Sequence, residues 1–171
     1  MTSLSAITFY GIAISAVFHF LMSFTYAQAP AIKPQMIVGN WRLNPEKSGL
    51  RNPPSQLMNL RQYRMRPDGF LVGLLYTSDP QGGYHYLQFT AKSDGQDYPE
   101  YSDVLVAEMI ATGKPTTRTY AEKVIDDYTT EWTDKANGRV TAQGKKIISK
   151  DGMTLTITMD GQSRVTVYDR Q

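Results

Sequence analysis

The sequence predicts an all-β domain, a single up-and-down barrel of about eight antiparallel strands with one short helix. Three observations favour this fold class. Short runs of β-branched and aromatic residues alternate with turn residues from about position 36 onward. Asn137-Gly138 and Asp151-Gly152 are dipeptides that favour the tight turns of β-hairpins. A meander of this length usually closes into a barrel, since closure removes the exposed edges of the sheet.

The expected elements follow from the apolar runs and from the Gly, Pro, Asn and Asp residues that separate them. One segment departs from the strand pattern and predicts a helix, because Ser102 can cap its start and Gly113 can end it. Ser93-Asp94-Gly95 is expected to end the run before it in a turn. The predicted strands are 36–43, 57–66, 70–77, 84–92, 117–124, 128–133, 139–150, 154–160 and 163–169, and the predicted helix is 102–111.

Alternation along the last two predicted strands indicates which side chains face the interior. Leu155, Ile157 and Met159 alternate with threonines, so they are expected to face inward. Val165 and Val167 likewise form the apolar face of the final strand. Both strands are therefore expected to be half buried.

The start of the chain differs from the rest in its charge. All 18 Lys and Arg and all 16 Asp and Glu residues lie after Ile32. An apolar stretch from about residue 7 to residue 24 is followed by Ala27-Gln28-Ala29, and small residues at −3 and −1 are typical of a signal-peptidase site. The sequence therefore predicts a signal peptide over 1–29, a barrel domain over 30–171, and a periplasmic or secreted protein without stable membrane association after cleavage.

Three alternatives to this interpretation of the N-terminal segment remain open. The segment is long enough for a retained anchor, because roughly 20 apolar residues span a bilayer. The start codon could be wrongly assigned, and cleavage could follow Ala27 instead of Ala29.

Composition excludes several classes of function. The chain of 171 residues has no cysteine, which excludes disulfides and thiol chemistry. Its net charge of +2 is too small to suggest nucleic acid as a partner. Arg61, Arg64 and Arg66 form a basic cluster, with Arg61 on the opposite strand face from the other two. A solvated strand face is the preferred interpretation of this cluster.

No metal or cofactor is expected. Four carboxylates lie close together at Asp94, Asp97, Glu100 and Asp103, but their spacing does not match a calcium-binding EF-hand loop. A solvated acidic loop is the preferred interpretation. The sequence also contains no Gly-x-Ser-x-Gly motif and no phosphate-binding glycine loop.

His85 is the candidate catalytic residue, since it is the single histidine left after cleavage of the leader. It shares a strand face with Leu87 and Phe89, so it points inward if they do. An imidazole beside Tyr63 or Tyr128 could transfer protons at neutral pH. A purely structural histidine, partly exposed or hydrogen-bonded, is the alternative.

The aromatic residues indicate a ligand cavity. Nine tyrosines and two tryptophans lie after the predicted leader, and tyrosine combines an apolar ring with a polar tip. We expect a small hydrophobic or aromatic molecule inside the barrel, with Tyr63, His85 and Tyr128 as candidate ligand-binding residues. An interior filled by side chains is equally compatible with a barrel of this size.

Four motifs resemble those of a known family. Gly39-Asn40-Trp41 resembles the Gly-x-Trp opening of calycin barrels, the superfamily of lipocalins, fatty-acid-binding proteins and avidins. Together with the runs 39–48, 94–99, 149–158 and 167–171, it resembles a family of small exported bacterial lipocalin-like proteins. The resemblance implies a fold and an exported location, but no reaction. It also implies that Trp41 closes one end of the barrel beneath Arg170.

Three hypotheses of function follow. The first is an exported protein that binds a small hydrophobic or aromatic molecule in the barrel. The second is a cofactor-independent isomerase, cyclase or hydrolase acting on a hydrophobic substrate, with His85 and a tyrosine or carboxylate moving protons. The third is an interaction module of the cell envelope with a filled core. The fold does not decide between them, because barrels of this type host both carriers and enzymes.

Overall fold

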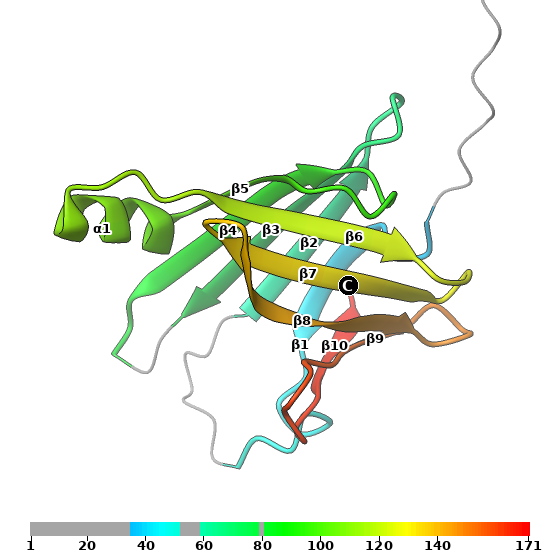
Figure 1. Cartoon of the computed structure of the whole chain (residues 1–171). Coiled ribbons are helices and arrows are strands. Elements are labelled where there is room, and N and C mark those ends of the chain that lie inside the picture. The colour runs from blue at the N-terminus through cyan, green and yellow to red at the C-terminus, as the bar shows by residue number, and fades with distance from the viewer. Residues whose placement is uncertain (1–34, 52–58, 79–80) are drawn as a thin grey trace, which may run out of the picture. The chain divides into compact units, whose positions relative to one another are not determined.

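Ten antiparallel strands follow one another around a closed barrel in the computed structural model, which describes residues 35–51, 59–78 and 81–171 (Figure 1). Each strand pairs with its neighbours in sequence, and β1 pairs with β10 to close the barrel. The predicted fold class is confirmed; the predicted signal peptide lies outside the described residues. The strands are β1 (Gly39–Leu43), β2 (Asn59–Met65), β3 (Leu71–Ser78), β4 (Tyr84–Ala91), β5 (Tyr98–Ser102), β6 (Arg118–Val124), β7 (Thr129–Ala136), β8 (Arg139–Ile148), β9 (Thr154–Ile157) and β10 (Thr166–Arg170).

Strand β5 is the element that the sequence pattern did not predict. Its sequence, Tyr-Pro-Glu-Tyr-Ser, contains a proline, which cannot donate to a strand ladder. The strand is accommodated because its pairing with β6 is short, with only Tyr98 opposite Tyr120 and Pro99 opposite Thr119. Ten strands instead of about eight give a wider barrel, since the diameter grows with strand number.

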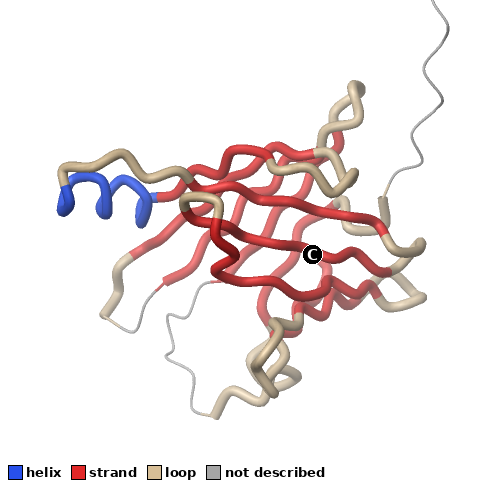
Figure 2. The backbone as a smooth tube through the Cα atoms, in the orientation of Figure 1, coloured by secondary structure: helices blue, strands red, loops and turns tan. Residues whose placement is uncertain are grey.

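The predicted helix is confirmed as α1 (Asp103–Thr112). The Ser102 side chain accepts a hydrogen bond from the Leu105 N–H at 3.1 Å, and Gly113 ends the helix with a φ of 64°. The helix packs against β4 and β5 and extends outward from them (Figure 2). No helix in the described part of the chain is long and apolar enough to cross a membrane.

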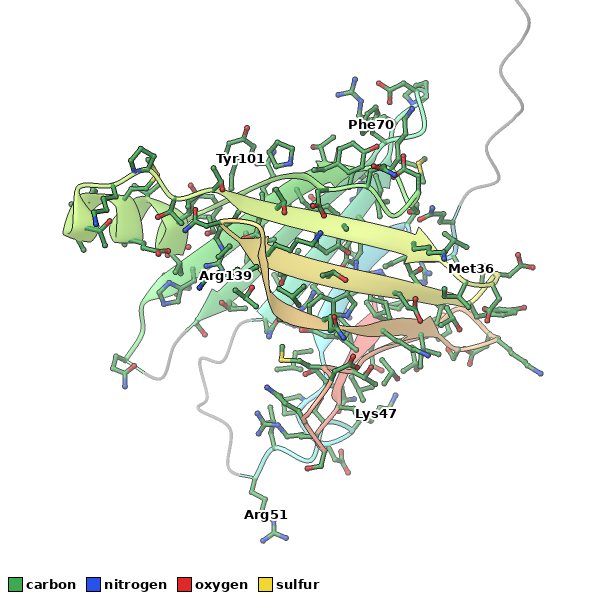
Figure 3. The ribbon with its side chains drawn as sticks, viewed as in Figure 1. Met36, Lys47, Arg51, Phe70, Tyr101 and Arg139 are labelled. Atoms are coloured by element: carbon green, nitrogen blue, oxygen red, sulfur yellow. The ribbon has the colours of Figure 1, made fainter. Side chains whose placement is uncertain are left out.

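The two ends of the barrel differ. The turns β2–β3, β4–β5, β6–β7 and β8–β9 lie at one end, which we name the closed end. Helix α1 and the β7–β8 and β9–β10 connections lie at the other, which we name the open end. Figure 3 shows Arg139 at the open end with α1, and Met36 and Phe70 at the closed end.

Trp41 and Arg170 lie together toward the closed end. Trp41 is fully buried and donates its indole N–H to the Ile37 carbonyl at 2.8 Å. The Arg170 guanidinium lies 4.2 Å from the centre of the Trp41 ring. It also donates to the carbonyls of Gly152, Val38 and Met36. The pair therefore ties together the two strands that close the sheet and the segments on either side of them.

The predicted face of β9 is confirmed, but that of β10 is wrong. Leu155 and Ile157 are buried in the core as expected. In β10 the interior residue is Tyr168, which is fully buried beneath Arg61 with 4.9 Å between guanidinium and ring centre. Val167 is buried on the opposite face, because the turn after β1 covers it and Ser48 bonds its backbone.

Candidate functional site

A central cavity of about 230 Å³ lies inside the barrel toward its open end. Exposed residues of the β9–β10 connection, Gln162 and Arg164, stand among its lining residues. Apolar and aromatic side chains form much of the wall: Leu75, Leu87, Phe89, Tyr120, Trp132, Ile157 and Met159. Polar and charged residues complete it: Arg61, Asp134, Lys146, Thr158, Gln162, Arg164 and Thr166.

The aromatic part of the wall is fixed by stacking. The rings of Phe89 and Tyr120 lie 3.8 Å apart between centres, with an interplanar angle of 23°. Gly73 lies opposite Phe89 across the β3–β4 pair, and a Cβ there would lie 2.3 Å from the Phe89 ring. The absence of a side chain at Gly73 therefore allows Phe89 to lie flat against β3.

A buried charge network forms the inner part of the cavity. Lys146 is 3% exposed and Glu122 1% exposed, and Lys146 Nζ lies 2.6 Å from a Glu122 carboxylate oxygen. Tyr120 donates to the same carboxylate and accepts from Lys146. The other Glu122 oxygen accepts from Ser93 at 3.1 Å. Burial, and then the negative charge of Glu122, raises the pKa of Tyr120 well above its ordinary value, so the phenol stays protonated.

Aromatic rings also surround the Lys146 ammonium. It lies 4.9 Å from the ring centre of Tyr120, 5.0 Å from that of Tyr63 and 5.2 Å from that of Phe89. Such contacts stabilise a desolvated cation by about 1–2 kcal/mol. The charge is thus compensated by one carboxylate and three rings.

Arg61 occupies the interior, which corrects the prediction of a solvated strand face for this residue. It shares the inward face of β2 with the fully buried Tyr63, and it donates weakly to the Tyr63 hydroxyl at 3.4 Å. Arg64, on the opposite face, is exposed as expected. Among the described residues no carboxylate lies within ion-pair distance of Arg61, and its buried Nε has no hydrogen-bond partner.

Trp132 and Asp134 face the cavity from β7. The buried indole N–H of Trp132 and the buried Oδ1 of Asp134 have no hydrogen-bond partner in the described structure. Burial raises the pKa of Asp134, although the positive charges of Lys146, Arg118 and Arg61 oppose the shift. A buried polar atom without a partner is costly, so these atoms mark a place for a bound group or water.

A second pocket of about 250 Å³ adjoins the central cavity, since Leu75 and Leu87 line both. Glu100 lies in it and is only 3% exposed, which corrects its assignment to a solvated acidic loop. Burial and the nearby Asp134 charge raise the pKa of Glu100 to about 7, and Arg118, 3.5 Å away, opposes the shift.

His85 lies on the rim of this second pocket, at the open end. Its Nδ1 is 2.7 Å from Asp103 Oδ2, and Asp103 Oδ1 accepts from the Tyr86 backbone N–H at 3.0 Å. Partial burial raises the pKa of Asp103, but the hydrogen bonds with His85 and the Tyr86 N–H lower it by more, so the pKa lies below its ordinary value. An imidazole oriented by a carboxylate is the arrangement found in general bases.

The three candidate ligand residues do not meet in one pocket. Tyr63 is fully buried beneath Lys146, whereas His85 is exposed beside Asp103 in the second pocket. Tyr128 lies in the β6–β7 turn at the closed end, where it lines other surface pockets with Asp126 and Asp127. In the part of the chain that the structure describes, no three His, Asp or Glu side chains gather in a manner that could hold a metal ion.

Arg61 and Glu100 were assigned to solvent because they are charged, and Glu122, Asp134 and Lys146 were not singled out from the sequence. The alternation of side chains along a strand would have indicated that some of these residues face inward. Arg61 precedes Tyr63 by two positions, Glu122 follows Tyr120 by two, and Asp134 follows Trp132 by two. Each charged residue thus shares an inward face with an aromatic residue.

Comparison with models of known protein families finds no matching family, and comparison with curated proteins finds no match either. The proposed function therefore rests on the fold and on the geometry of the cavities.

Proposed function

We propose that this protein is an exported binding protein that takes a small hydrophobic or aromatic molecule into the central cavity of its barrel. The observation that carries the proposal is the central cavity itself, with an aromatic and aliphatic wall and a few charged groups at fixed positions. Binding sites for small molecules combine these two features. The Gly-x-Trp opening and the closed antiparallel barrel support membership of the calycin superfamily as part of this proposal.

Native mass spectrometry of the mature protein, exported in its own host, tests this function. The native mass is compared with the denatured mass of the same sample. A reproducible excess that disappears on denaturation is expected, and its size gives the ligand class. If the native and denatured masses agree and tryptophan fluorescence responds to no member of a panel of small aromatic compounds, the binding function is wrong.

A second function has one specific observation in its favour, the His85–Asp103 pair at 2.7 Å beside a pocket. In this function His85 acts as a general base toward a hydrophobic substrate in the second pocket, and the Asp103 carboxylate orients the ring. His85→Gln is expected to abolish turnover of such a substrate while leaving ligand binding in the central cavity unchanged. Tyr84→Phe, on the exposed surface of the same strand, is the matched control.

A further inference from the structure

Three buried polar atoms of the central cavity have no partner in the described structure. They are two donors, Arg61 Nε–H and Trp132 Nε1–H, and one acceptor, Asp134 Oδ1. All three residues line the same cavity. In native proteins most buried polar atoms are paired, so three unpaired atoms around one cavity indicate a missing group with matching chemistry.

The barrel places these atoms on opposite walls. Arg61 comes from β2, and Trp132 and Asp134 come from β7, which lies across the barrel from β2 in the strand order. Arg61 is close enough to influence the ionisation of Asp134, but the two do not form an ion pair. All three residues line the central cavity, so a group bound there lies next to both walls.

The signs of the charges restrict the chemistry of that group. An anion beside Arg61 would face the Asp134 carboxylate, and a cation beside Asp134 would face the Arg61 guanidinium. Lys146 is already paired with Glu122, and Arg164 is exposed at the mouth of the cavity, where water screens its charge. Within the described structure, Arg61 and Asp134 are therefore the two charges inside the cavity that lack an ion-pair partner. A neutral group that accepts from the two donors and donates to the carboxylate satisfies all three atoms.

We propose that the ligand of the central cavity is an aromatic amide, a planar ring bearing a carboxamide or lactam whose C=O accepts from Arg61 and Trp132 and whose N–H donates to Asp134. This inference rests on the proposed binding function and narrows its ligand class. The stacked Phe89 and Tyr120 rings provide a flat wall against which an aromatic ring can pack.

Isothermal titration calorimetry of the mature protein with three matched probes tests the inference. The probes are naphthamide, naphthoate and methylnaphthalene, substituted at the same ring position. Naphthamide is expected to bind at least about tenfold more tightly than either of the others, because hydrogen bonds to buried partners contribute at this level.

Substitutions of Asp134 and Arg61 test whether these two residues cause the preference for naphthamide. Asp134→Ala and Arg61→Met are each expected to reduce naphthamide affinity about tenfold and to leave methylnaphthalene binding within about twofold. Arg139→Gln, an exposed residue at the same end of the barrel, is the matched control and is expected to change neither. Thermal denaturation of each variant shows whether it retains the fold.

The possible outcomes separate the inference from the function on which it rests. If naphthoate binds most tightly and Asp134→Asn strengthens its binding, the ligand is an anion and the inference is overturned. Equal binding of all three probes means that water satisfies the polar atoms, which overturns the inference but leaves the binding function standing. Binding of no probe, together with a native mass free of any adduct, overturns both.

Discussion

At the scale of single residues, the interior depends on how Lys146 and Glu122 compensate each other. Both are almost completely buried, and each is the nearest opposite charge to the other. Removing one member of a buried ion pair leaves an uncompensated charge, whereas replacing both is often nearly neutral. The pair is therefore costly to break but does not by itself demonstrate a gain in stability.

Lys146→Met should lower the free energy of unfolding by about 3–5 kcal/mol, because it leaves the Glu122 carboxylate buried without its cation. The double variant Lys146→Met with Glu122→Gln should recover most of this loss. Chemical denaturation measures both. Lys145→Met is the control, since Lys145 lies on the same strand with a side chain that is 51% exposed. A loss as small as that of the control would contradict the buried position of Lys146.

The ionisation of Glu100 makes the free energy of unfolding of the barrel depend on pH, and the direction of this dependence follows from its pKa. Its folded pKa of about 7 lies above the ordinary value of 4.5, so the folded state retains a proton that the unfolded state releases between these values. The contribution is fully present below about pH 4.5 and is lost as the pH rises through 7. We expect the Glu100 contribution to lower the free energy of unfolding by about 2–3 kcal/mol as the pH rises from 5 to 8.5.

Denaturation at these two pH values, in wild type and in Glu100→Gln, measures that contribution. The variant should show a smaller fall in stability toward high pH, because an amide does not titrate in this range. Glu108→Gln, on the exposed side of α1, should behave as wild type. If Glu100→Gln retains the full dependence, another group is responsible for it.

At the scale of elements, sequence pattern predicted the parts in which local chemistry decides the backbone. The Asn137-Gly138 turn has the positive φ values of 49° and 76° that these residues favour, and it joins β7 and β8 as expected. Ser102 and Gly113 bound α1 for the same reason. Strand β5 was missed because its pairing partners, not its own Pro-containing sequence, make it a strand.

The pairing of β3 with β4 leaves no room for a side chain at Gly73 opposite the Phe89 ring, and this can be tested. Gly73→Ala should lower the free energy of unfolding by about 1–3 kcal/mol, because the new Cβ would overlap the Phe89 ring. Phe89→Leu in the same chain should relieve part of this loss. Thermal denaturation measures stability, and near-ultraviolet circular dichroism measures the change around the stacked rings. Additive losses in the double variant would show that the two positions do not interact.

At the scale of the whole barrel, closure depends on the Trp41–Arg170 pair between β1 and β10. Trp41→Ala should lower the free energy of unfolding by about 3–5 kcal/mol, since it opens a cavity beneath the guanidinium and removes a buried hydrogen bond. Trp41→Phe, which keeps most of the ring, should cost less than half as much. Urea denaturation makes the comparison, and a loss below about 1 kcal/mol for Trp41→Ala would mean that the residue is not part of the closure.

The last prediction concerns the relation of the barrel to the predicted signal peptide. Every strand in the described part of the chain starts at or after Gly39, so cleavage after Ala29 would leave all of them in the mature chain. If the predicted signal peptide is removed after Ala29, the intact mass should correspond to residues 30–171, with unchanged denaturation behaviour. Replacing Ala27 and Ala29 by leucine should block processing, because signal peptidase requires small residues at these positions. A full-length chain recovered from the membrane fraction in wild type would instead establish the retained anchor, with the same barrel tethered to the bilayer.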